Sequence, residues 1–136
     1  PAEFIKDVSF RIWFYHPDPV FLDELAERVK KGEYVYTPSL GNASCIAETA
    51  FVNYVDAEEI RDEKMIQFQS IVPLSSIDVV NFESMMYMVR IRLPFRMKSD
   101  RTVTEYADVY LDESGKAVEA KAGRFFRIGE DNVLFI

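Results

Sequence analysis

The side chains best suited to chemistry lie in a basic stretch that begins at Arg90. Its basic residues recur at even spacing, and one more comes directly after them: Arg90, Arg92, Arg96, Lys98 and Arg101. Residues two apart share one face of a β-strand, so this spacing predicts a single cationic face if Pro94 bends the strand without flipping it. The apolar residues between them would then face the core.

A row of arginines on a strand suits the binding of phosphate groups. The planar guanidinium matches two phosphate oxygens at once, and flat rings beside it can stack unpaired bases. Three tyrosines offer such rings: Tyr87, Tyr106 and Tyr110. The pattern therefore favours a site for single-stranded RNA. The alternative is an ordinary outward strand face, in which the arginines form ion pairs with Asp100, Glu105 and Asp108.

Histidine and cysteine each occur once, which limits catalytic chemistry. His16 excludes His-rich metal sites and leaves one residue, just before Pro17, for acid–base work; its alternative role is an aromatic cap on the first strand. Cys45, next to Ser44, cannot form an internal disulfide or a four-ligand zinc site. The sequence holds neither of the common glycine-rich phosphate loops. We expect no metal and no cofactor.

The composition is that of a folded protein. The chain has 136 residues and 15.8 kDa, with 49% hydrophobic and 29% charged residues, which fits one domain and excludes disordered or repetitive classes. No stretch approaches the about 18–20 apolar residues of a membrane span, and no signal segment opens the chain, so we expect a cytoplasmic protein. The net charge is −7, but residues 90–127 hold 9 basic and 6 acidic side chains.

The first part of the chain predicts one helix beside strand patterns. Residues 8–15 alternate apolar and polar types and are rich in aromatic residues, which predicts a strand. Asp18 and Pro19 form an N-cap and a first-turn proline, and apolar residues then recur at helical spacing, which predicts an amphipathic helix over 19–31. The proline, glycine and asparagine of residues 37–42 mark a turn.

The remaining chain reads mainly as strands. We expect them at residues 49–55, 66–72, 87–93, 102–111, 117–122, 125–128 and 133–136. The acidic residues 56–64 are expected in a solvated loop, Pro73 ends a strand, and 112–116 form a hairpin turn. About eight strands and one helix predict an α+β fold with a mostly antiparallel sheet.

The segment Tyr36–Ala47 resembles a motif of the Cas-five family of CRISPR-associated proteins. That motif is roughly tyrosine, any residue, proline, any residue, leucine and glycine, followed after two variable positions by a small residue and often a cysteine. Further similarity lies at Phe4–Trp13, Ser70–Pro73, Arg92–Met97 and Asp100–Val103. The order and spacing are most similar to the type I-B branch. The family belongs to the RAMP superfamily and caps the 5′ handle of the crRNA in Cascade-type effector complexes.

The resemblance implies a ferredoxin-like (RRM/RAMP-type) remnant plus an antiparallel β-rich C-terminal region. Residues 1–82 would be the C-terminal part of the ferredoxin-like domain, and residues 83–136 the β-rich region. The N-terminal half of family members has no counterpart before Pro1, which is not an initiator methionine, so we expect a piece of a longer protein. Open sheet edges in such a piece invite self-association.

The resemblance also implies a function, namely a non-catalytic scaffold in antiviral defence. It would bind crRNA and contact the backbone and large subunits of Cascade, with no membrane partner. Gly41 would bring backbone N–H groups near the RNA, with Tyr36, Asn42 and Ser44 as further contacts. Relatives often place basic residues after this glycine, and none is present there in this chain, so we expect residues 90–101 to carry more of the electrostatics.

Two other functions stay open. The type I-C branch of the family is a metal-independent endoribonuclease that uses Tyr, Lys and His, for which His16 and Tyr15 are the candidates here. His16 has no neighbouring lysine, and no second histidine can replace it. The other function is that of an α+β interaction module, unrelated to CRISPR, whose aromatic residues dock a protein partner: Trp13, Tyr15, Phe125 and Phe126.

Overall fold

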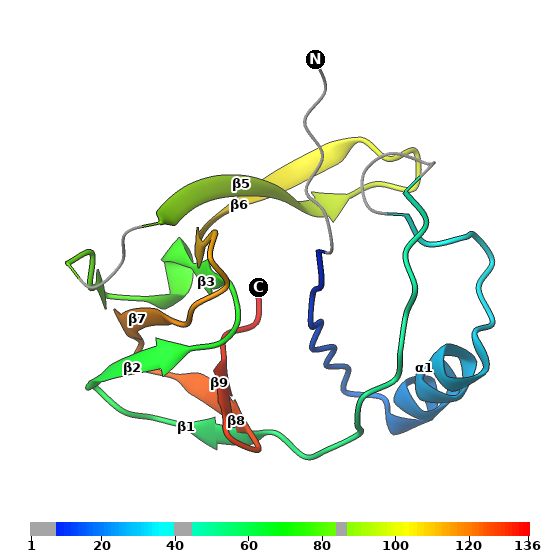
Figure 1. Cartoon of the computed structure of the whole chain (residues 1–136), viewed down its shortest axis with the longest axis horizontal. Coiled ribbons are helices and arrows are strands. Elements are labelled where there is room, and N and C mark those ends of the chain that lie inside the picture. The colour runs from blue at the N-terminus through cyan, green and yellow to red at the C-terminus, as the bar shows by residue number, and fades with distance from the viewer. Residues whose placement is uncertain (1–7, 40–44, 84–86) are drawn as a thin grey trace. The chain divides into compact units, whose positions relative to one another are not determined.

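The computed structural model describes residues 8–39, 45–83 and 87–136. Contacts within the chain define two compact units, Pro1–Tyr54 and Val55–Ile136. The described part of the first unit contains one helix, and that of the second contains all the named strands (Figure 1). Each unit is therefore considered by itself.

Helix α1, Pro19–Lys31, forms where the sequence predicts it. The Asp18 carboxylate accepts a hydrogen bond from the Val20 N–H at 3.0 Å, and Pro19 occupies the first turn, where a helix needs no N–H. At the other end Gly32 has a φ of 67°, a left-handed conformation that favours glycine. No residue of α1 is buried, so its caps, rather than a core, define where it begins and ends.

Two strand predictions in the first unit are wrong. Residues 8–15 and 49–55 form no strand with any residue that the structure describes. A strand needs hydrogen-bond partners on a neighbouring strand, and an alternating pattern does not by itself provide one. Their apolar side chains consequently remain exposed, as Ile12 and Val52 illustrate at 85% and 73% of their surface.

The described residues of the second unit form nine short strands and one 3₁₀ turn. They are β1 (Glu58–Ile60), β2 (Met65–Phe68), β3 (Val72–Pro73), η1 (Leu74–Ser76), β4 (Val79–Val80), β5 (Met88–Met97), β6 (Val103–Asp112), β7 (Val118–Lys121), β8 (Phe125–Ile128) and β9 (Asp131–Val133). All pairings are antiparallel. They build three sheets, with strand orders β1-β8-β9, β2-β7-β4 and β3-β6-β5.

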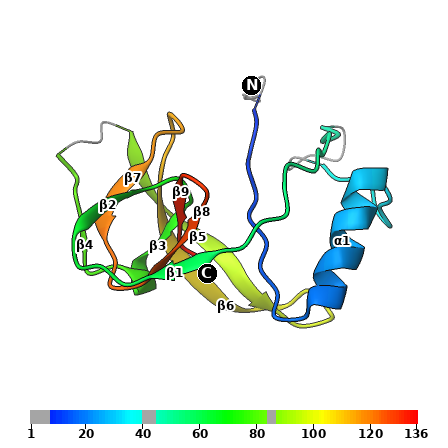
Figure 2. The same ribbon diagram turned by 90° about the horizontal axis from the view of Figure 1, so that it is seen from below.

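The three sheets share one hydrophobic core. Figures 1 and 2 show the strands of the second unit gathered around an interior. Its fully buried members come from all three sheets and the C-terminal segment: Phe68, Val72, Val118, Ala120, Ala122, Phe125 and Leu134. The rings of Phe68 and Phe125 meet edge to face, 5.5 Å between centroids. Each sheet is too small to bury a face alone, so packing around these side chains holds the unit together.

Several details of the expected topology are corrected. The acidic run contains β1 and is more than a loop. The turn at 112–116 exists, with the Gly115 N–H donating to the Asp112 carbonyl at 3.0 Å, but it closes no hairpin, because β7 pairs with β2 and β4. β3 ends at Pro73, as predicted.

The fold is α+β and rich in β-structure, and the described residues show no ferredoxin-like topology. One helix accompanies three small antiparallel sheets instead of one sheet covered by two crossover helices. The boundary expected at residues 82 and 83 falls inside the second unit. There β2 and β4, which precede it, pair with β7, which comes after it.

The β5–β6 hairpin is the longest pairing in the molecule. Its register runs from Met88 opposite Asp112 to Met97 opposite Val103. The chain reverses at residues 99–101, where the Lys98 N–H donates to the Thr102 carbonyl at 3.0 Å. β5 is the outermost strand of its sheet, so its outer edge has no neighbouring strand among the described residues.

Candidate nucleic-acid interface

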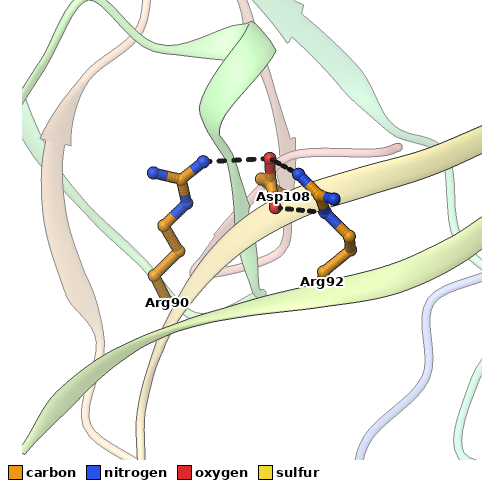
Figure 3. A network of polar contacts seen from close by, with 3 residues as sticks. All are labelled: Arg90, Arg92 and Asp108. Carbon is orange, nitrogen blue, oxygen red and sulfur yellow. Dashed lines mark hydrogen bonds and ion pairs between the residues drawn. The ribbon is translucent and has the colours of Figure 1, made fainter.

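Arg90 and Arg92 lie on either side of one carboxylate, that of Asp108 (Figure 3). Arg90 Nη2 donates to Asp108 Oδ2 at 3.0 Å. Arg92 donates through Nε to Oδ1 at 3.1 Å and through Nη2 to Oδ2 at 3.3 Å. The strand register explains this arrangement, because Arg92 stands directly opposite Asp108 and Arg90 is two residues away on the same face. We call these three residues the Asp108 bracket.

The Asp108 bracket is a positively charged surface site. Two guanidinium groups share one carboxylate, which leaves a net charge of about +1 at neutral pH. Hydrogen bonds from Arg92 and then Arg90 hold the pKa of Asp108 below its ordinary value, and the same contact raises the pKa of Arg92. The arginine side chains are 55% and 65% exposed. All three groups therefore stay ionised near neutral pH, and the guanidinium groups remain open to a phosphate.

Arg96 does not share this face, so the expectation of one continuous cationic row is wrong. A register shift between Pro94 and Arg96 places Arg96 opposite Glu105. Glu105 is three residues from Asp108 along β6, and alternation puts the two on opposite faces. Arg96 Nε lies 3.2 Å from the Glu105 carboxylate, and its guanidinium lies 5.3 Å from the Phe95 ring centroid. Pro94 and the adjoining bulge therefore flip the strand, contrary to the condition under which the sequence predicts a single face.

Lys98 and Arg101 mark the tip of the hairpin. Neither side chain has a carboxylate partner among the residues that the structure describes. Asp100, the third expected partner, instead accepts a hydrogen bond from the Thr102 N–H at 2.9 Å, which lowers its pKa. Arg101 has a φ of 66°, the left-handed conformation usually given to glycine at the end of such three-residue loops. The tip thus presents two cations on a backbone that an arginine adopts at some cost.

Of the three tyrosines, Tyr106 is best placed for stacking. It is 55% exposed and stands opposite Pro94, two residues from Asp108 on the bracket's face. Tyr110 lies on the same face but is half-buried, and its ring meets that of Phe82 edge to face at 5.6 Å. Tyr87 is 54% exposed and precedes β5. An aromatic platform beside the Asp108 bracket is therefore Tyr106.

The loop residues expected to contact RNA are mostly outside the described part of the chain. Gly41, Asn42 and Ser44 lie there, together with the tight turn expected at Gly41. The two ends of this segment are held together by an antiparallel bridge between Ser39 and Ile46. Tyr36, three residues before Ser39, is 82% exposed. It belongs to the first unit, whereas the arginines belong to the second.

His16 contributes to the start of α1. Its Nδ1 accepts a hydrogen bond from the Asp18 N–H at 3.1 Å, and its ring lies 4.6 Å from that of Phe21, between centroids. Tyr15 beside it is 60% exposed. These contacts resemble the capping role given as the alternative, except that His16 caps the helix after it, because residues 8–15 before it form no strand.

A second bracket was not found from the sequence. Arg61 Nη2 lies 3.2 Å from Glu59 Oε1, and Arg124 Nη2 lies 3.1 Å from Glu59 Oε2. Arg124 is also 5.6 Å from the centroid of the Phe126 ring. The pairing of β1 with β8 brings these residues together. Since Arg61 and Arg124 are far apart in sequence, no local pattern could have linked them. We call this group the Glu59 bracket.

The aromatic residues suggested for protein docking fall into different environments. Phe125 is 1% exposed and belongs to the core, so its assignment to a docking surface is wrong. Phe126 packs edge to face with Phe135 at 5.4 Å between centroids. Trp13 is half-buried, and the Arg11 guanidinium lies 6.0 Å from its ring centroid. Among the described helices none is both long and apolar enough to cross a bilayer.

No family model matches the chain, and no curated protein or solved structure is significantly similar to it.

Proposed function

We propose that this chain is a non-catalytic RNA-binding scaffold that holds the 5′ handle of a crRNA in a type I CRISPR effector complex. The observation that carries the proposal is the Asp108 bracket, in which Arg90 and Arg92 share one carboxylate on an exposed strand. The choice of crRNA and of the effector complex rests on the resemblance of Tyr36–Ala47 to the Cas-five motif.

The chemistry of the bracket fits a phosphate better than a neutral partner. A phosphate can displace Asp108 from one guanidinium while the other keeps the carboxylate paired, so binding strands no buried charge. Tyr106 on the same face offers a ring for an unstacked base, and bases and phosphates alternate along a single strand at comparable spacing. Lys98 and Arg101 extend the positive surface to the tip of the hairpin. A single strand of RNA lying along the hairpin would engage all of these groups.

The test is binding of a labelled crRNA carrying its 5′ handle, with and without the backbone subunit, at about 50 and 200 mM salt. The variant is the double substitution Arg90→Ala and Arg92→Ala. The matched control is Arg61→Ala with Arg124→Ala, which removes two arginines that likewise share one carboxylate. We expect the variant to weaken binding and to reduce the salt slope by about one to two units, and the control to change neither.

Three results would count against the proposal. Equal losses in the variant and the control would mean that total charge, not the hairpin, determines binding. An affinity that hardly responds to salt would indicate an apolar interface and so the interaction module. Cleavage of repeat RNA without divalent ions, abolished by His16→Ala, would support the endoribonuclease instead.

A further inference from the structure

Residues 9–15 present an unusually apolar surface in the first unit. Phe10, Ile12 and Phe14 alternate along the segment and keep 70%, 85% and 56% of their surface exposed. The segment contains no proline and one charged residue, Arg11, and its aromatic and β-branched types favour strands. It nevertheless forms no strand with any described residue. A strand-forming sequence of this kind is suited to pairing with another chain.

One antiparallel register matches the segment to itself. Centred on Ile12, it places Phe10 of one copy opposite Phe14 of the other, and Ile12 opposite Ile12. All three apolar residues then line one face in both copies, as two-fold symmetry requires. The opposite face pairs Arg11 with Trp13, a combination already in contact within one chain at 6.0 Å. Shifting the register by one residue would place apolar side chains beside polar ones.

We propose that two copies of this chain associate by pairing residues 9–15 as antiparallel strands about a two-fold axis at Ile12. Helix α1 contributes to the same apolar surface, because the rings of Phe14 and Phe21 lie 6.2 Å apart between centroids. Phe21 is 44% exposed and Val20 72%. The paired ribbon therefore carries one α1 helix from each copy beside its apolar face.

The buried area sets the strength of this dimer. From their exposed fractions, Phe10, Ile12 and Phe14 would bury on the order of 400 Å² per copy, or about 800 Å² in the pair. This is below the about 1,200 Å² of stable interfaces, even before the backbone and α1 are added. The dimer is accordingly concentration-dependent, with the monomer dominating in dilute solution.

The other open edge of the molecule is a poorer candidate for self-association. β5 has no neighbour on its outer side among the described residues, but Pro94 and two register shifts interrupt it. Arg90 and Arg92 would also approach arginines of a second copy. Proline, bulges and charge are the features by which natural edge strands avoid pairing. Residues 9–15 have none of these except Arg11, which the proposed register places opposite an aromatic ring.

Sedimentation equilibrium of the full chain from about 1 µM to about 1 mM tests the proposal. The variant is Ile12→Lys, which places two like charges at the two-fold axis. Its control is Val35→Lys, since Val35 is also in the first unit and is similarly exposed, 83% against 85%. We expect dimerisation in the wild type and in Val35→Lys, and at least tenfold weaker dimerisation in Ile12→Lys. A monomer throughout, or equal behaviour of the two variants, would overturn the proposal.

Disulfide trapping tests the register independently of any effect on folding. In a Cys45→Ser background, which removes the one native cysteine, Ile12→Cys places two thiols across the two-fold axis within bonding distance. Val35→Cys is the matched control. Mild oxidation should give a covalent dimer rapidly with Ile12→Cys and slowly with Val35→Cys. Equal rates for the two would refute the proposed register.

Discussion

Replacing Asp108 with asparagine should increase RNA affinity, because the carboxylate competes with phosphate for two arginines. Asparagine has nearly the same shape and keeps one acceptor oxygen, but it removes the negative charge that Arg90 and Arg92 share. The net charge of the Asp108 bracket rises from about +1 to +2. Both guanidinium groups then become available to the RNA without first giving up an ion pair.

The magnitude comes from counterion release. Each added phosphate contact steepens the dependence of log K on log salt by about 0.7 for a single strand. At about 0.1 M salt this corresponds to about fivefold in affinity for one contact and about 25-fold for two. The Asp108→Asn variant should therefore bind a handle RNA about 5- to 25-fold more tightly and with a slope about 0.7–1.4 units steeper.

Fluorescence anisotropy with labelled RNA at several salt concentrations measures both quantities. Glu59→Gln is the matched control, because Glu59 is shared by Arg61 and Arg124 in the same way. It adds the same unit of charge to a surface outside the proposed RNA site. The reasoning is refuted if Asp108→Asn leaves affinity and slope unchanged, or if Glu59→Gln produces the same gain.

Three further predictions concern stability. Arg101→Gly relieves the positive φ of 66° and should stabilise the protein by about 1 kcal/mol while weakening RNA binding, as thermal melting and anisotropy will show. Phe68→Ala empties the core against Phe125 and should cost about 3–5 kcal/mol in urea unfolding, whereas a loss under 1 kcal/mol would contradict the core assignment. Hydrogen bonds from Ser114 lower the pKa of Asp112, so its stabilising effect is present above about pH 4 and lost as pH falls through the folded-state pKa; Asp112→Asn should flatten acid unfolding measured by circular dichroism.

Local features of the sequence predicted the elements whose cause is local. Helix α1 begins at Asp18 and ends before Gly32, because a cap and a left-handed glycine act within one turn. The alternation of residues 102–111 predicted β6 to within one residue at either end. The ion pairs of Arg92 and Arg96 were also foreseen as the alternative to an RNA site, since Asp108 and Glu105 lie on the next strand.

Predictions that depended on a distant partner succeeded less well. Residues 8–15 have a stronger strand pattern than β1, yet β1 is the strand, because β8 pairs with it. The hairpin expected after Asp112 failed for the same reason, since β7 finds β2 and β4. Side-chain alternation shows that a segment can be a strand, whereas pairing depends on which other segments the fold brings beside it.

The helix and its caps, the basic composition of residues 90–101 and the apolar alternation of β5 and β6 can all be read from the amino-acid sequence alone. The division of the cations between two faces required the folded structure, because one extra residue at the bulge after Pro94 reverses every side chain beyond it. The sharing of Glu59 by Arg61 and Arg124 required it too, since it depends on contact between strands far apart in the chain. Charge content is a property of the local sequence, while the direction and the partner of each charge depend on strand register.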